Sequence, residues 1–89
     1  MKAFITVIGK DGLGIIAHIA TALAELEVNI LDINQTVMEG TFTMIMMVDV
    51  SKSRVPFNEL SEEMDKAGRK LGLSVQIQHE DIFNSMHRL

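Results

Sequence analysis

The fold of this chain is decided by the glycine-rich stretch Ile8-Gly9-Lys10-Asp11-Gly12-Leu13-Gly14, which separates an apolar run from an apolar helix pattern. The run from Lys2 to Ile8 carries Ala3, Ile5 and Val7 on one face and Phe4, Thr6 and Ile8 on the other. Because both faces are mostly apolar, the run is predicted to be a central strand of a sheet.

Beyond the glycines, apolar residues recur at helical spacing, namely Leu13, Ile16, Ile19, Ala20 and Leu23. We expect a helix from about Leu13 to Leu26, capped by Asp11 or Gly12, with His18, Thr21 and Glu25 facing water. Glycine lets the loop turn sharply and come close to another molecule. The unpaired N–H groups of the first helical turn would favour an anion such as a carboxylate there.

The remaining chain alternates strand and helix patterns. A strand from Val28 to Met38 is expected to have one buried and one wet face, and the Glu39-Gly40 pair predicts a tight hairpin turn. Thr41 to Val50 is apolar on both faces and reads as a second central strand. A helix then begins near Pro56 and ends at Gly72. The rest is a strand with Val75 and Ile77 inward and a tail with helical spacing at Ile82, Phe83, Met86 and Leu89.

This order predicts an α+β, ferredoxin-like βαββαβ fold with a four-stranded antiparallel sheet in the order 4-1-3-2. Two helices would cover one face, and a short C-terminal helix would follow. We divide the chain into a domain over residues 1–80 and a helical tail over 81–89. The helix-free face keeps an apolar stripe, so either the tail or another subunit is expected to cover it. Met46 is expected to lie on that face, so Met46→Asp would disrupt it.

Composition argues against several classes of function. The 89 residues carry a net charge of −4 and no cysteine, so a basic nucleic-acid surface, disulfides and thiolate metal sites are not expected. No signal peptide or membrane span is predicted, and we expect a cytoplasmic protein without a cofactor. His79, Glu80, Asp81 and His87 lack the spacing of metal ligands, so no metal site is predicted.

Two stretches resemble the ACT domain, a small-molecule-binding module of amino-acid metabolism. They are Gly9 to Ala17, similar to the family's ligand loop and helix start, and Leu26 to Ile33, where an Asn-Ile pair is usual. The following Gln35 to Phe42 resembles free-standing bacterial ACT proteins without an attached enzyme. The resemblance covers about residues 2 to 80. It departs where Gly12-Leu13 replaces the common Arg-Pro, which removes a cation and a rigid turn.

The resemblance implies a homodimer that holds an amino-acid-like effector between the first loop of one subunit and the second strand of its neighbour. Carried over by position, the ligand-binding residues would be Asp11, Gly12, Leu13 and Gly14 on the loop and Asn29 and Ile30 on the strand. Each also has a structural alternative. Asp11 can cap the helix, the glycines can serve the turn alone, and Asn29 can satisfy the backbone between helix and strand.

The sequence therefore predicts a non-catalytic regulatory protein whose output passes through another protein. The alternative is a ligand-free interaction module that acts through its sheet face. A small enzyme using Asp11, His18 and Asn29 is a weaker third hypothesis, because the helix direction is expected to turn His18 away from the loop. No nucleophile–base pair, metal cluster or phosphate loop in the sequence supports an active site.

Overall fold

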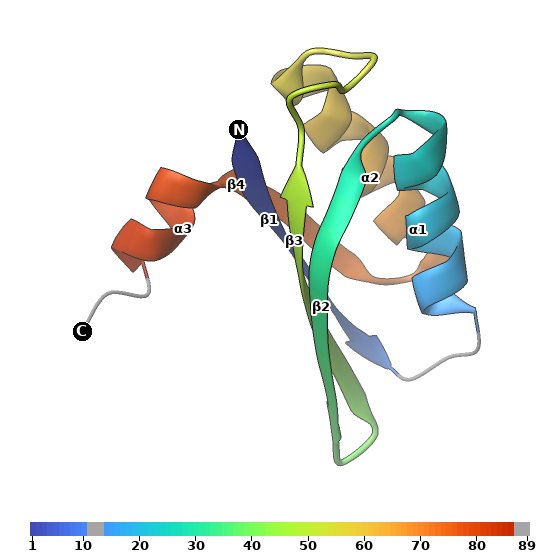
Figure 1. Cartoon of the computed structure of the whole chain (residues 1–89). Helices are drawn as coiled ribbons and strands as arrows, with labels where there is room; N and C mark the ends of the chain where they lie inside the picture. Colours follow the sequence, from blue (N-terminus) through green and yellow to red (C-terminus); the bar gives the residue numbers. More distant parts are fainter. Residues whose placement is uncertain (11–13, 87–89) are drawn as a thin grey trace.

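The computed structural model describes residues 1–10 and 14–86 of the chain. Seven elements follow one another in the predicted βαββαβ order, with the tail helix at the end (Figure 1). Their bounds are β1 (Lys2–Lys10), α1 (Ile15–Glu25), β2 (Asn29–Met38), β3 (Thr41–Asp49), α2 (Phe57–Leu71), β4 (Ser74–His79) and α3 (Glu80–Met86).

The four strands form one antiparallel sheet in the order β2-β3-β1-β4, which confirms the predicted topology. Strand β1 lies between β3 and β4, with Ile5 opposite both Met46 and Ile77. Helices α1 and α2 lie together on one side of this sheet, whereas α3 lies apart from them beside the start of β1 (Figure 1).

The core lies between the sheet and these two helices. Strand β1 contributes Ala3, Ile5 and Val7, all with no exposed surface, and the same face of β3 contributes four more buried side chains: Phe42, Met44, Met46 and Val48. The helices bury Ile15, Ile19 and Leu23 from α1 and Leu60, Met64 and Ala67 from α2. Met46 thus faces the helices, so its expected place on the helix-free face is wrong and Met47 occupies that face instead.

Strand β2 departs from its prediction. All its residues are exposed except the half-buried Ile30, so the expected buried face is absent. A bulge between Ile30 and Asp32 leaves Leu31 without a partner on β3. The bulge reverses the alternation, so Ile30 shares the helix side with Ile33 while Asp32 faces the other way. Ile33 and Val37 stay exposed because β2 is the outermost strand beside the helices.

The turn between β2 and β3 has the predicted two residues. Met38 pairs with Thr41, and both Glu39 (φ 50°) and Gly40 (φ 80°) have positive φ angles. Two positive φ angles define the turn type whose twist matches a hairpin. Gly40 adopts this geometry without strain, whereas Glu39 is a side-chain-bearing residue in the left-handed region.

The helix ends are partly as predicted. Helix α1 begins at Ile15, and its N-cap residue is Gly14, with φ 80°, rather than Asp11 or Gly12. Among the described residues, no side chain donates or accepts a capping hydrogen bond at this end. Helix α2 follows Pro56 and ends at Gly72, whose φ of 72° is the left-handed conformation that glycine favours at this position. Leu71, the last residue of α2, is 37% exposed.

The helix-free face, which we call the open face, carries the predicted apolar stripe, and this stripe is only partly covered. Phe4, Ile45 and Met47 are half-buried on it. Helix α3 covers one part, since the ring of Phe83 stacks on that of Phe4 with centroids 4.1 Å apart. Ile82 of the same helix remains 53% exposed. The expected contribution of Leu89 lies outside the described residues.

Gly68 on α2 has no room for a side chain. A Cβ atom there would lie 2.6 Å from Cγ2 of Val75 and 3.0 Å from the carbonyl oxygen of Leu73. We expect Gly68→Ala to lower the free energy of unfolding by about 1–3 kcal/mol through overpacking. This loss would outweigh the gain of about 1 kcal/mol in helix propensity. Urea unfolding measures the change.

Glu62→Ala on the exposed side of α2 is the matched control and should change stability by less than about 0.5 kcal/mol. If Gly68→Ala instead stabilised the protein, as alanine does in an open helix position, the close packing of α2 on β4 would be contradicted.

Candidate functional site

The loop half of the predicted site lies at the end of β1. Asp11, Gly12 and Leu13 lie outside the described residues, so the structure places only Gly14 of the four loop residues. Gly14 is exposed, and no atom of the residues that the structure describes lies within 4 Å of the position that a Cβ would take. Its carbonyl accepts the first helical hydrogen bond from the N–H of His18 at 2.8 Å. Helix α1 therefore opens toward solvent at this point.

Gly9 approaches its own chain closely. A Cβ at Gly9 would lie 2.2 Å from Cδ2 of Leu73, in the connection between α2 and β4. The sequence suggested that this glycine admits another molecule, but the structure fills the space with Leu73. Gly9 thus positions the loop by packing β1 against that connection.

The strand half of the predicted site lies at the start of β2. Asn29 is the first residue of the strand, is exposed, and pairs with Asp49 of β3. Ile30 is half-buried, pairs with Val48 and packs against the core. Asn29 therefore offers its amide to solvent, while the Ile30 side chain mainly supports the strand.

These two halves lie at opposite ends of the sheet. At one end of the sheet, Phe42 of β3 pairs with Gly9 of β1 and with Val37 of β2. At the other end, Asp49 of β3 pairs with Lys2 of β1 and with Asn29 of β2. At about 3.3 Å per residue, the ends are separated by roughly 25 Å. One chain alone cannot bring Gly14 and Asn29 to the same small ligand.

The edge of β2 carries much of the exposed apolar surface. Leu31, Ile33, Val37 and Met38 are 41%, 38%, 53% and 69% exposed. Strand β2 is also an edge of the sheet, so one side of its backbone has unpaired N–H and C=O groups. Both features are typical of a strand that pairs with another chain.

A groove of about 720 Å³ runs between α1 and α2 and begins beside Gly14. The small side chains of Ala17, Ala22 and Ala67 are among its lining residues. Its rim carries charges of both signs, among them Glu25 and Lys70. His18 lines the same groove and is exposed, as the sequence predicted. The structure does not bring His18 into contact with Asn29, which lies at the far end of the sheet from Gly14.

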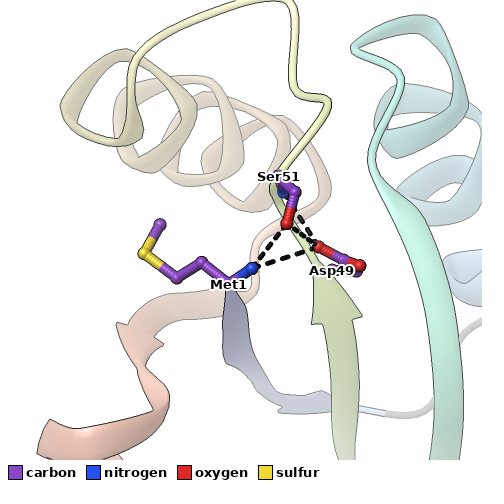
Figure 2. A network of polar contacts seen from close by, with 3 residues as sticks. All are labelled: Met1, Asp49 and Ser51. Carbon is purple, nitrogen blue, oxygen red and sulfur yellow. Dashed lines mark hydrogen bonds and ion pairs between the residues drawn. The ribbon is translucent and has the colours of Figure 1, made fainter.

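A polar network holds the start of β1 against the end of β3 (Figure 2). The N-terminal amine of Met1 donates to the Ser51 hydroxyl at 2.5 Å and lies 3.5 Å from the Asp49 carboxylate. The hydroxyl and backbone N–H of Ser51 donate to that carboxylate at 2.6 and 2.9 Å. These bonds from Ser51, helped by the positive amine, lower the pKa of Asp49 from 3.8 to about 2.

Two structural absences hold over residues 1–10 and 14–86. No group of three or more His, Cys, Asp or Glu side chains is placed to hold a metal ion. None of the helices in this described part is long and apolar enough to cross a membrane.

Comparison with known proteins agrees with this architecture. The family model of the ACT domain matches residues 2–78. A UPF0237 protein of Clostridium acetobutylicum is 57% identical over 89 residues, which is 100% of both chains. A UPF0237 protein of Methanocaldococcus jannaschii is 51% identical over 88 residues, covering 99% of this chain and 98% of its own. The chain therefore belongs to the ACT domain family.

A solved structure supports the same assignment. The ACT domain protein from Streptococcus pneumoniae superposes with a TM-score of 0.82 at 43% sequence identity, and the match covers 93% of each chain. The resemblance drawn from Gly9 to Ala17 and from Leu26 to Ile33 is thus confirmed at the level of the family and the fold.

The lowered pKa of Asp49 gives a test of the network in Figure 2. Above about pH 4 the carboxylate is charged in both folded and unfolded chains, so the network stabilises the fold fully. That contribution is lost as the pH falls through about 2, where the folded chain takes up the proton. The ¹³C shift of the Asp49 carboxyl carbon, followed from pH 6 to pH 1.5, measures this pKa.

Ser51→Ala removes the largest cause of the shift and should raise the pKa of Asp49 toward 3.8. Ser53→Ala is the matched control, because that hydroxyl donates to the carbonyl of Val55 instead and should leave the pKa near 2. Equal pKa values in the two variants would contradict the assigned role of Ser51.

Proposed function

We propose that this ACT domain is a regulatory, non-catalytic domain that binds a small amino acid between two copies of the chain. The observation that carries the proposal is the edge strand β2, which is exposed along almost its whole length and holds four of the large exposed apolar side chains. An exposed strand of this kind is stabilised by pairing with a second copy.

Antiparallel pairing of β2 with its copy would also complete the site. In a two-fold dimer, the start of β2 from one copy points toward the end of its partner's sheet where β1 leads into Gly14. The roughly 25 Å between the two halves within one chain is then no obstacle, because each site takes its halves from different chains.

The ligand-binding residues in this proposal are those that the family resemblance implies. Asp11, Gly12, Leu13 and Gly14 would line the loop side, the first three lying outside the described residues. The N–H groups at the start of α1 would donate to the ligand carboxylate. Asn29, exposed at the start of β2, would accept a hydrogen bond from the ligand ammonium, and Ile30 would hold the strand in place.

A second candidate function rests on the open face. Phe4, Ile45 and Met47 remain half-buried there, and α3 covers them only in part. A protein that docks on this surface would make the chain an interaction module, through which a regulatory output could also pass. Met47→Asp is the variant that would disrupt such docking, since Met46 belongs to the core.

A thermal-shift screen against the twenty amino acids tests ligand binding. A ligand at about 100 times its dissociation constant adds roughly 2.7 kcal/mol to the stability. For a domain of this size, that amounts to a rise of about 10 °C in Tm. We expect Asn29→Ala to abolish the shift, and Asn58→Ala, an exposed asparagine on α2, to retain it.

Sedimentation at micromolar concentration tests the pairing. Val37→Lys on the β2 edge should convert a dimer to a monomer and remove the ligand shift together with it. Glu62→Lys, on the far side of α2, should leave both unchanged. A monomeric wild-type protein, or a ligand shift that survives Val37→Lys in the monomer, would refute a site shared between copies.

A further inference from the structure

A separate hollow of about 400 Å³ lies on the open face, between β2 and α3. Its residues come from four elements, and one chain supplies all of them. Phe4, Ile45, Met47 and Phe83 form its apolar part, which we call the floor. Its size falls within the range of small-molecule pockets, about 300–1,000 Å³.

The floor is held by an aromatic contact. The rings of Phe4 and Phe83 stack at 4.1 Å with an angle of 18° between their planes. Phe4 belongs to a central strand whose opposite face is fully buried, so its backbone is fixed on both sides by β3 and β4. Helix α3 therefore forms one side of the hollow through Phe83.

The other side is a polar wall on β2. Asp32, Asn34 and Thr36 lie opposite Met47, Ile45 and Thr43, and so share the open face with the floor. The bulge at Leu31 produces this arrangement, because it sends Ile30 to the helix side and keeps the three polar residues on the open face.

The polar wall carries negative charge, at the Asp32 carboxylate. Asp32 is the one ionisable side chain among the described residues that line the hollow. One of its oxygens accepts the backbone N–H of Ile33 at 2.9 Å. Within the described part of the chain, no Lys, Arg or His side chain lies at ion-pair distance from it. The hollow therefore joins an apolar floor to a carboxylate that has no ion-pair partner among residues 1–10 and 14–86.

We propose that this hollow binds a small organic amine. The ammonium group would pair with the Asp32 carboxylate, and the amide of Asn34 and the hydroxyl of Thr36 offer further hydrogen-bonding groups beside it. The apolar or aromatic body of the ligand would lie on Phe4, Met47 and Phe83. The negative charge of Asp32 on the polar wall would repel an anionic ligand of the same shape.

This site is distinct from the one between copies. It lies on the open face rather than along the β2 edge, and it needs no second chain. Pairing of β2 in the plane of the sheet leaves the open face accessible, so the two sites can be tested independently.

Three probes of one shape but different charge provide the experiment. Phenethylamine, 2-phenylethanol and phenylacetate are titrated into the full chain while the methyl signals of Ile45 and Met47 are followed by NMR. We expect phenethylamine to move these signals and to bind roughly tenfold more tightly than the alcohol. Phenylacetate should bind more weakly still. Equal binding of all three, or signals that do not move, would overturn the proposal.

Two variants check the carboxylate. Asp32→Asn keeps the shape and can still accept the Ile33 N–H, so it should fold, yet it should weaken phenethylamine roughly tenfold and leave 2-phenylethanol unchanged. Glu62→Gln removes a carboxylate on the far side of the sheet and should have no effect. Phenethylamine binding that survives Asp32→Asn would refute the site.

A further variant distinguishes amine binding in the hollow from ligand binding at the proposed site between two copies. Asn29→Ala should leave phenethylamine binding intact, because Asn29 does not line the hollow. Loss of amine binding in Asn29→Ala, but not in Asp32→Asn, would place the amine at the β2 start and overturn the assignment to the open face.

Discussion

The structure depends on one constraint, the central position of β1. This strand pairs on both sides, and its alternate side chains meet two different environments. Ala3, Ile5 and Val7 are sealed beneath α1 and α2, whereas Phe4 and Thr6 are only half-buried on the other face. A central strand with apolar residues on both faces requires cover on both. The helix layer supplies one cover, and α3 supplies part of the other through Phe83.

Much of this fold could be predicted from local pattern. Apolar residues on both faces predicted that the first and third strands are central, and Gly40 and Gly72 predicted the turn and the helix end, where positive φ angles are found. The strand order followed from the ferredoxin-like order of the elements, and the apolar faces of the two central strands agreed with it. These features succeed because each depends on residues close together in the sequence.

The features that escaped prediction depend on distant partners. The bulge at Leu31 leaves no mark in a stretch that alternates regularly, because it is defined only by the register against β3. The close approach of Gly9 to Leu73 and of Gly68 to Val75 likewise joins elements far apart in the chain. Strand β2 was predicted to have one buried face because its apolar residues were assigned to the core, whereas Ile33 and Val37 are exposed at the edge of the sheet.

The candidate site shows the same division. Asn29 and Gly14 were identified as single residues from the family pattern, but their separation at opposite ends of the sheet follows from strand direction alone. The hollow on the open face was not foreseen at all. It requires the bulge, the register of three strands and the stacking of Phe83, none of which is visible in a local stretch.

The two edges of the sheet are unequal, and this limits how copies can assemble. Strand β2 presents ten residues along one edge, whereas β4 presents six along the other, with Ser74 and Gln76 among them. Like-to-like pairing of β2 uses the long edge of both copies at once, so only the shorter edges remain. Such pairing would use both β2 edges in a two-chain unit and would leave β4 as its edge on each side. Pairing of β2 with β4 would leave one edge of each kind free at every step and would grow as an open-ended ribbon.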